Sequence, residues 1–381
     1  MKITQVICQV LRVESVTEKT ASCQDVALVR IVSDTGLEGI GEADASPEVV
    51  QAVIDAPFSH NIACGLRELL VGQDPLAIRR NWNRMYRGSM YFGRTSVTVA
   101  AMAAVDMALW DLAGKLLGQP VATLLGGQLQ SRIVAMASFI FDMDDLQWTV
   151  DEFQWMRDQG YQTVKAGWGM HPDALFGQDR QRDIDIVRRV RQVIGDELDL
   201  VVDTPGHLRI WDAPTAIQRC RDLEEFQLRW LEQPLPPHDL EAHARLRAAV
   251  ATPIGTGEDE WNVESYRRLI QSGGVDVIQM DPGRCHGITG CRQYIKLIEA
   301  ENLQWSAHTW SSALNTAASV HLMANSTHGI AMDFKPHESP MQHELVTDPW
   351  IQQAGYLAVR DQPGLGVEVN EDIVEKYHFE A

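Results

Sequence analysis

The chain has 381 residues, of which 45% are hydrophobic and 22% charged, a balance typical of a globular protein with more than one domain. Its 33 lysines and arginines against 52 aspartates and glutamates give a net charge of −19. A surface this acidic repels phosphate backbones and anionic lipids, which argues against nucleic acids and membranes as partners.

Strands and helices alternate irregularly in the first third of the chain. Residues 2–12 and 26–33 have the pattern of strands, and Ser33 to Gly36 forms a turn toward a further strand near Ile40. Helical periodicity dominates from residue 47 to residue 117. We therefore predict a small α+β domain over residues 1–125.

The longest apolar stretch runs from Val97 to Leu117. Because Asp106, Asp111 and Lys115 interrupt it, we expect a buried helix and not a membrane span, with structural roles for both aspartates. The six cysteines form no Cys-x-x-Cys pair, as is typical of free thiols in a reducing compartment. The N-terminus lacks a signal-peptide pattern, and the cytoplasm is the expected location.

From about residue 130 short apolar runs alternate with amphipathic helices, which predicts a parallel sheet. The expected strands are residues 133–140, 163–165, 198–202, 230–231, 254, 275–280, 304–307 and 330–332. Seven or eight such units over about 220 residues predict a TIM-type (β/α) barrel at residues 126–349. Residues 350–381 are expected to pack back on the first domain.

A charged or titratable residue ends six of the apolar runs. In a barrel of this kind such side chains share one mouth at the C-terminal ends of the strands. They are Lys165, Asp203, Glu232, Glu258, Asp281 and His308.

Three of these residues are successive carboxylates, Asp203, Glu232 and Glu258. They would repel one another at one mouth unless a cation neutralised them. An all-oxygen trio suits a hard cation such as Mg²⁺. Because His-x-His and His-Glu-x-x-His are absent, a zinc hydrolase is not favoured.

On the facing strands, Asp281 precedes His308 by one strand–helix unit. A neighbouring carboxylate orients an imidazole and raises its basicity, so His308 is the predicted general base. The proton next to a carboxylate is very weakly acidic, and a bound cation lowers the barrier to its removal. Lys165 is placed to add positive charge at the same oxygens.

At these residues the sequence resembles the mandelate racemase branch of the enolase superfamily over essentially its whole length. The matching motifs are Ala104 to Lys115, Leu124 to Gly127, Val202-Asp203, Leu231 to Pro234, Gly257-Glu258, Asp281, His308-Thr309 and Pro363 to Gly366. The resemblance implies a capping domain, metal ligands at Asp203, Glu232 and Glu258, a His308–Asp281 dyad, and a small-molecule carboxylate as substrate. It also implies a symmetric homo-oligomer.

The chain departs from this family at three positions. The second lysine of a Lys-x-Lys pair is replaced by Gly167, an Asn after the first metal ligand by Pro205, and a Glu on the eighth strand by Asp333. Because racemisation needs a base on each face of the substrate, the loss at Gly167 favours one-base chemistry. The resemblance implies sugar acids, so we predict β-elimination of water from an aldonate or aldarate.

The identity of the general acid stays open at this point. His308 can return its proton in a syn elimination, or His207, four residues after Asp203, can act as the acid. The alternatives to dehydration are a sugar-lactone cycloisomerase, an epimerase, and a barrel that binds metal and ligand without catalysis. Specificity is expected to reside in capping-domain loops, at Val16 to Cys23 and Asp44 to His60.

Overall fold

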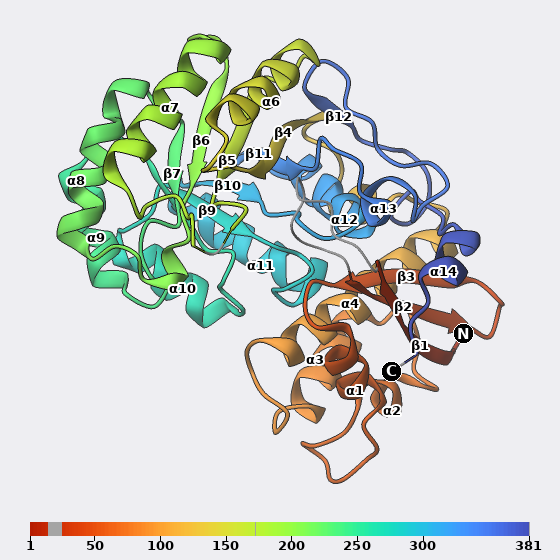
Figure 1. Ribbon diagram of the computed structural model, residues 1–381. Helices are drawn as coiled ribbons and strands as arrows, with labels where there is room; N and C mark the ends of the chain where they lie inside the picture. Colours follow the sequence, from red (N-terminus) through yellow and green to blue (C-terminus); the bar gives the residue numbers. More distant parts are fainter. Residues whose placement is uncertain (14–24, 172, 381) are drawn as a thin grey trace.

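The computed structural model describes residues 1–13, 25–171 and 173–380. A barrel and a capping domain pack against each other, and both chain ends lie at the capping domain (Figure 1). The predicted specificity loop at Val16 to Cys23 lies outside the described residues. In the second predicted loop, Asp44 to His60, residues Pro47–Asp55 form a helix.

The larger domain is a closed barrel of eight parallel strands, counted over the part of the chain that the structure describes, and it confirms the predicted fold. The strands follow in chain order, and β11 pairs with β4 to close the ring. They are β4 (Arg132–Ile140), β5 (Thr163–Gly167), β6 (Asp199–Asp203), β7 (Trp230–Glu232), β8 (Ile254–Thr256), β9 (Val277–Met280), β10 (Gln304–Ala307) and β11 (Gly329–Phe334).

Helices cover the outside of the barrel, each connecting one strand to the next (Figure 1). They are α6 (Leu146–Asp158), α7 (Arg180–Ile194), α8 (Ala213–Leu223), α9 (Leu240–Ala249), α10 (Val263–Ser272), α11 (Gly287–Ala300) and α12 (Ala313–Ala324). Two 3₁₀ turns, η1 (Gly206–Leu208) and η2 (Glu224–Phe226), and the short helix α13 (Pro340–His343) complete this part. Pro340 begins α13, a position where the missing amide hydrogen of proline costs the helix no hydrogen bond.

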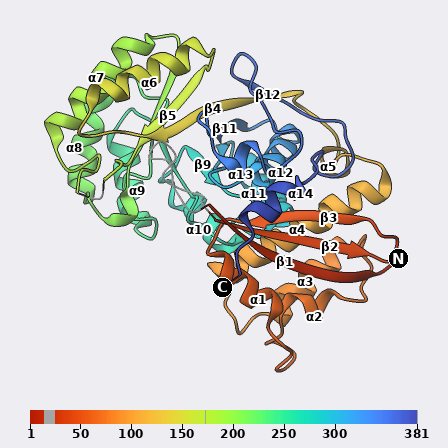
Figure 2. The same ribbon diagram turned by 45° about the vertical axis from the view of Figure 1, so that its right-hand side comes forward.

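The capping domain is a three-stranded antiparallel sheet with helices packed against it (Figure 2). Its elements are β1 (Ile3–Arg12), β2 (Asp25–Ser33), β3 (Glu38–Ala43), α1 (Pro47–Asp55), α2 (Leu66–Leu70), α3 (Ile78–Gly88), α4 (Val97–Leu117) and α5 (Val121–Leu125). Helix α4 approaches β3 closely because Gly41 has no side chain: a Cβ there would lie 2.2 Å from the Ala104 carbonyl oxygen.

Helix α4 is long and apolar enough to cross a membrane, yet 94% of its most apolar stretch is buried inside the protein. This confirms the prediction of a buried helix. Both of its aspartates are fully buried and hold other segments in place. Asp106 accepts a hydrogen bond from the Thr289 amide at the start of α11, and Asp111 accepts from the Ile40 and Leu365 amides.

The C-terminal segment contacts both domains. Strand β12 (Tyr356–Ala358) pairs antiparallel with β4, whereas the Phe379 amide donates to the Val10 carbonyl of β1. Between them, helix α14 (Glu371–Tyr377) places Glu371 against Arg30 of β2. Residues 350–380 therefore tie the end of the chain to the barrel and to the cap.

Asp106 gives a pH-dependent prediction. Burial raises its pKa to about 7, although the Thr289 hydrogen bonds oppose the shift. Between about pH 4 and pH 7 the folded protein keeps a proton that the unfolded chain releases, so the free energy of unfolding falls as pH rises through that window. At about 1.4 kcal/mol per pKa unit the effect is a few kcal/mol.

Asp106→Asn removes this titration and keeps a carbonyl oxygen for the Thr289 amide. Thermal unfolding should show the variant gaining stability relative to wild type between pH 5 and pH 7. The exposed substitution Asp34→Asn is the control. A difference in midpoint that stays constant across this range would contradict the assignment.

Candidate active site

The structure places the predicted strand-end residues at one mouth of the barrel. A cavity of about 570 Å³ is lined by Lys165, Asp203, His207, Glu258 and His308, together with residues from the capping domain. Neighbouring strands hold these side chains in register, since Asp203 pairs with Gly167 on one side and with Glu232 on the other. Glu232, Asp281 and Asp333 are buried and lie behind the cavity lining.

Lys165 lies among three carboxylates. Its Nζ is 2.5 Å from Glu232 Oε1, 3.3 Å from Asp203 Oδ2 and 3.4 Å from Asp333 Oδ1. Burial lowers the pKa of the Lys165 ammonium, but these carboxylates together raise it well above its ordinary value. Lys165 therefore places a positive charge among the three carboxylates at the mouth.

The predicted metal ligands carry more negative charge than Lys165 neutralises. Burial and neighbouring carboxylates raise the pKa of Asp203 well above its ordinary value, and burial also raises that of Glu232. Asp203 Oδ1 is buried and has no hydrogen-bond partner among the residues that the structure describes. An unsatisfied oxygen within a crowded set of carboxylates is the donor chemistry that a hard divalent cation requires. The residues present therefore fit a Mg²⁺ ion.

The trio is not gathered as tightly as a filled metal site. Lys165, Trp230 and Gln279 hold the Glu232 carboxylate, whereas Arg284 and His308 contact that of Glu258. Among the described residues, the one group with three possible ligand atoms within 4.8 Å is Asp44, Asp281 and His308. Arg284 already supplies a positive charge there, since its Nε lies 2.8 Å from Asp44 Oδ2.

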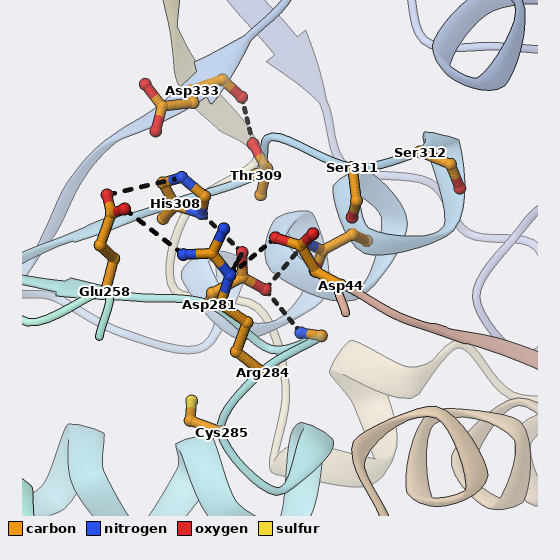
Figure 3. Close-up of polar contacts among 12 residues, drawn as sticks. Asp44, Glu258, Asp281, Arg284, Cys285, His308, Thr309, Ser311, Ser312 and Asp333 are labelled. Carbon is orange, nitrogen blue, oxygen red and sulfur yellow. Dashed lines mark hydrogen bonds and ion pairs between the residues drawn. The ribbon is translucent and has the colours of Figure 1, made fainter. Parts of the chain in front are cut away.

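His308 and Asp281 form the predicted pair. His308 Nδ1 lies 2.6 Å from Asp281 Oδ2, and His308 Nε2 lies 3.5 Å from Glu258 Oε2 (Figure 3). Burial lowers the pKa of His308, Glu258 and Asp281 raise it, and the balance puts it at about 9. A ring with this pKa is protonated at neutral pH. A cation held by Glu258 would offset the charge that raises the pKa, and Nε2 would then carry the lone pair while Asp281 holds Nδ1.

Position 167 has no room for a side chain. A Cβ on Gly167 would lie 1.7 Å from the Asp203 carbonyl oxygen, which also accepts the Trp168 amide at 3.1 Å. The close approach of β5 and β6 at their ends therefore excludes a second lysine at this position. The observation supports chemistry with a single base at His308.

Two matches with known families decide the ancestry of the chain. Residues 2–126 match the N-terminal domain of mandelate racemase and muconate lactonizing enzyme, and residues 148–373 match the enolase C-terminal domain-like family. The chain belongs to the mandelate racemase branch of the enolase superfamily. The resemblance in the sequence motifs is thereby confirmed.

Relatives within the superfamily catalyse more than one reaction. The chain is 26% identical over 365 residues to D-galactarolactone cycloisomerase from Agrobacterium fabrum, covering 92% of this chain and 91% of that protein. It is 27% identical to D-galactonate dehydratase from Xanthomonas campestris, with 91% and 90% covered. A racemase from Streptomyces coelicolor, solved with bound magnesium, superposes with a TM-score of 0.86 at 25% identity, with 99% and 100% covered.

In this superfamily member, His207 and Asp333 occupy different surroundings. His207 is exposed on η1 and packs against Trp168, with ring centroids 4.6 Å apart. Trp168 has a φ of 58°, an unfavourable backbone conformation for a bulky residue and one found more often at functional sites. Asp333 accepts the Ser138 hydroxyl at 2.5 Å and lies below Lys165, so it contacts the cation and not the cavity.

Arg284 was not among the residues predicted from the sequence, and Asp44 was named only as the start of a predicted specificity loop. Arg284 is partly buried and contacts Asp44, Glu258 and Asp281, and both it and Asp44 line the cavity. Arg284 follows Asp281 by three residues, so collecting every charged residue just past each strand would have found it. Asp44 comes from the capping domain, and no periodicity in the barrel points to it.

Lys165→Met should lower the thermal midpoint in the absence of metal, because three buried carboxylates lose the cation within 3.4 Å of them. Added Mg²⁺ should then stabilise the variant more than wild type, since the site has become more negative. Turnover should fall about 100-fold, the usual effect of removing one stabilising charge. Lys2→Met, at the exposed N-terminus, is the control. Equal midpoints without metal would contradict this role.

Proposed function

We propose that the chain is a Mg²⁺-dependent dehydratase that eliminates water from an acid sugar, an aldonate or aldarate, to give a 2-keto-3-deoxy acid. The observation that carries the proposal is the single base: His308 is held by Asp281, and position 167 has no space for a second base. The relatives named above support sugar acids as the substrate class.

Each side chain has a distinct task in this reaction. His308 Nε2 removes the proton next to the substrate carboxylate, and Asp281 stabilises the imidazolium that forms. Asp203, Glu232 and Glu258 would hold Mg²⁺, whose charge stabilises the enediolate. Lys165 adds a fixed positive charge at the same end of the cavity.

The leaving hydroxyl needs a proton. His308 can return the one that it removed, in a syn elimination, or His207, which also lines the cavity and packs on Trp168, can donate one. His207→Asn separates these routes, because only the second loses turnover. We also propose a cytoplasmic homo-oligomer that acts on a small-molecule carboxylate, with no nucleic-acid or membrane partner.

A sugar-lactone cycloisomerase is the second candidate, favoured by the similarity to D-galactarolactone cycloisomerase. Such a reaction also needs one base. Purified enzyme with Mg²⁺ should be screened against aldonates, aldarates and their lactones, with detection of 2-keto products by semicarbazide. A keto product from an open-chain acid supports dehydration, whereas conversion of lactones alone supports the cycloisomerase. Turnover of neither class contradicts the proposed substrate class.

A further inference from the structure

Two capping-domain carboxylates reach the barrel mouth from one strand end. Glu42 is the penultimate residue of β3 and Asp44 follows the strand directly. Because residues two apart on a strand point to the same side, both side chains face the barrel. Each one contacts a group that in turn contacts Asp281, the residue that orients His308.

The first connection runs through the start of α12. Glu42 is fully buried. Its Oε1 accepts hydrogen bonds from the Ser311 hydroxyl at 2.6 Å and from the Asn315 backbone amide at 2.9 Å. A carboxylate at the N-terminus of a helix is stabilised by the free amides and the helix dipole. Asn315, in the first turn of that helix, donates its side-chain amide to Asp281 Oδ1 at 2.9 Å. Glu42 thus fixes the turn that holds one oxygen of Asp281.

The second connection runs through Arg284 (Figure 3). Asp44 Oδ2 accepts from Arg284 Nε at 2.8 Å, and the Asp44 amide donates to the Gly283 carbonyl at 3.1 Å. Arg284 Nη1 lies 3.3 Å from Glu258 Oε1, and Arg284 Nε lies 3.9 Å from Asp281 Oδ2. The Gly283 amide donates to Asp281 Oδ1 at 2.7 Å. Asp44 therefore holds the loop that carries the remaining contacts of Asp281.

We propose that Glu42 and Asp44 are positioning residues for the His308–Asp281 pair. The capping domain would then hold the general base His308 in its orientation. The inference rests on the proposed function only for its effect on turnover. The positioning of Asp281 and His308 by these two carboxylates does not depend on which substrate is bound. A carboxylate–imidazole pair needs both partners fixed, because small misplacements at a reacting centre cost large factors in rate.

The first arm of the test needs no substrate. The proton between His308 Nδ1 and Asp281 should give a hydrogen-bonded imidazole resonance far downfield in the NMR spectrum of the Mg²⁺-loaded full-length protein. His308→Asn, which removes that proton, assigns the resonance. Asp44→Asn and Glu42→Gln should lose or broaden it, because Asp281 is then held on fewer sides. Asp34→Asn, an exposed carboxylate of the same domain, should retain it.

The second arm measures turnover of the acid sugar that the panel above converts fastest. Asp44→Asn should lower kcat about 10- to 100-fold with KM little changed, the range found when supporting residues of a site are lost. If Asp44 acts through Arg284, the double variant Asp44→Asn/Arg284→Gln should lose no more turnover than the less active of the two single variants. A purely structural role would lower the thermal midpoint and leave kcat per folded molecule unchanged.

The outcomes separate the two claims. Variants that fold, keep the downfield resonance and turn over as fast as wild type overturn the positioning role. Loss of the resonance in Asp44→Asn, with no acid sugar converted even by wild type, supports positioning and refutes the proposed substrate class. Since Glu42 is fully buried and Glu42→Gln can fail to fold, the partly exposed Asp44 carries the decision in that case.

Discussion

Replacement of His308 by asparagine is expected to lower kcat about 1,000-fold, within the range for loss of a general base. Asparagine can keep a hydrogen bond to Asp281 but cannot accept the substrate proton. The fold should survive, because this hydrogen bond leaves the buried Asp281 carboxylate with a partner. Steady-state kinetics at saturating Mg²⁺ measure the loss, with circular dichroism to verify folding.

His378→Asn, an exposed histidine that follows α14 and is not part of the cavity lining, is the matched control and should leave kcat unchanged. Turnover by His308→Asn within tenfold of wild type would remove His308 from the role of base. The pair with Asp281 would then be a structural hydrogen bond, and the search for the base would move to His207.

Glu258→Gln is expected to weaken Mg²⁺ binding about 100-fold or more, since affinity for hard cations depends on the number of charged oxygen ligands. The amide preserves the size of the side chain and removes its charge. Calorimetric titration with MgCl₂ alone measures the change without reference to any substrate. The substitution should also lower the pKa of His308, because the charge of Glu258 raises it.

Asp259→Asn is the control for this substitution. Asp259 also lines the cavity, but its carboxylate accepts the Gln233 side-chain amide at 3.0 Å and was not predicted as a ligand. Wild-type affinity for Mg²⁺ in Glu258→Gln, or an equal loss in both variants, would show that the three predicted ligands are not the metal site.

The sequence predicted the barrel well because its strands are buried on both faces and its helices have one apolar side. Residues Leu200 to Asp203 of β6, for example, are buried throughout, and a short run buried on both faces is typical of a strand in a parallel sheet. The same regularity put the functional residues at strand ends, where the structure finds Asp203, Glu232, Asp281 and His308.

What the sequence missed depends on contacts between distant segments. The sequence predicted Lys165 as a positive charge at the mouth, but its contact with Asp333, 168 positions away in the chain, appears only in three dimensions. Arg284 gains its partner Asp44 from another domain, and the two are 240 positions apart. Gly167 is an intermediate case: the sequence showed that the lysine is missing, and the structure shows that no side chain fits.

Removal of the proton next to a substrate carboxylate by His308 is the step on which the proposed function depends. It is tested most directly by incubating the Mg²⁺-loaded enzyme with an acid sugar deuterated at C2 and following the label by NMR. We expect the label to be lost to solvent and the deuterated substrate to react more slowly than the protonated one. His308→Asn should show neither effect. A product that keeps its deuterium at the original carbon would contradict the account.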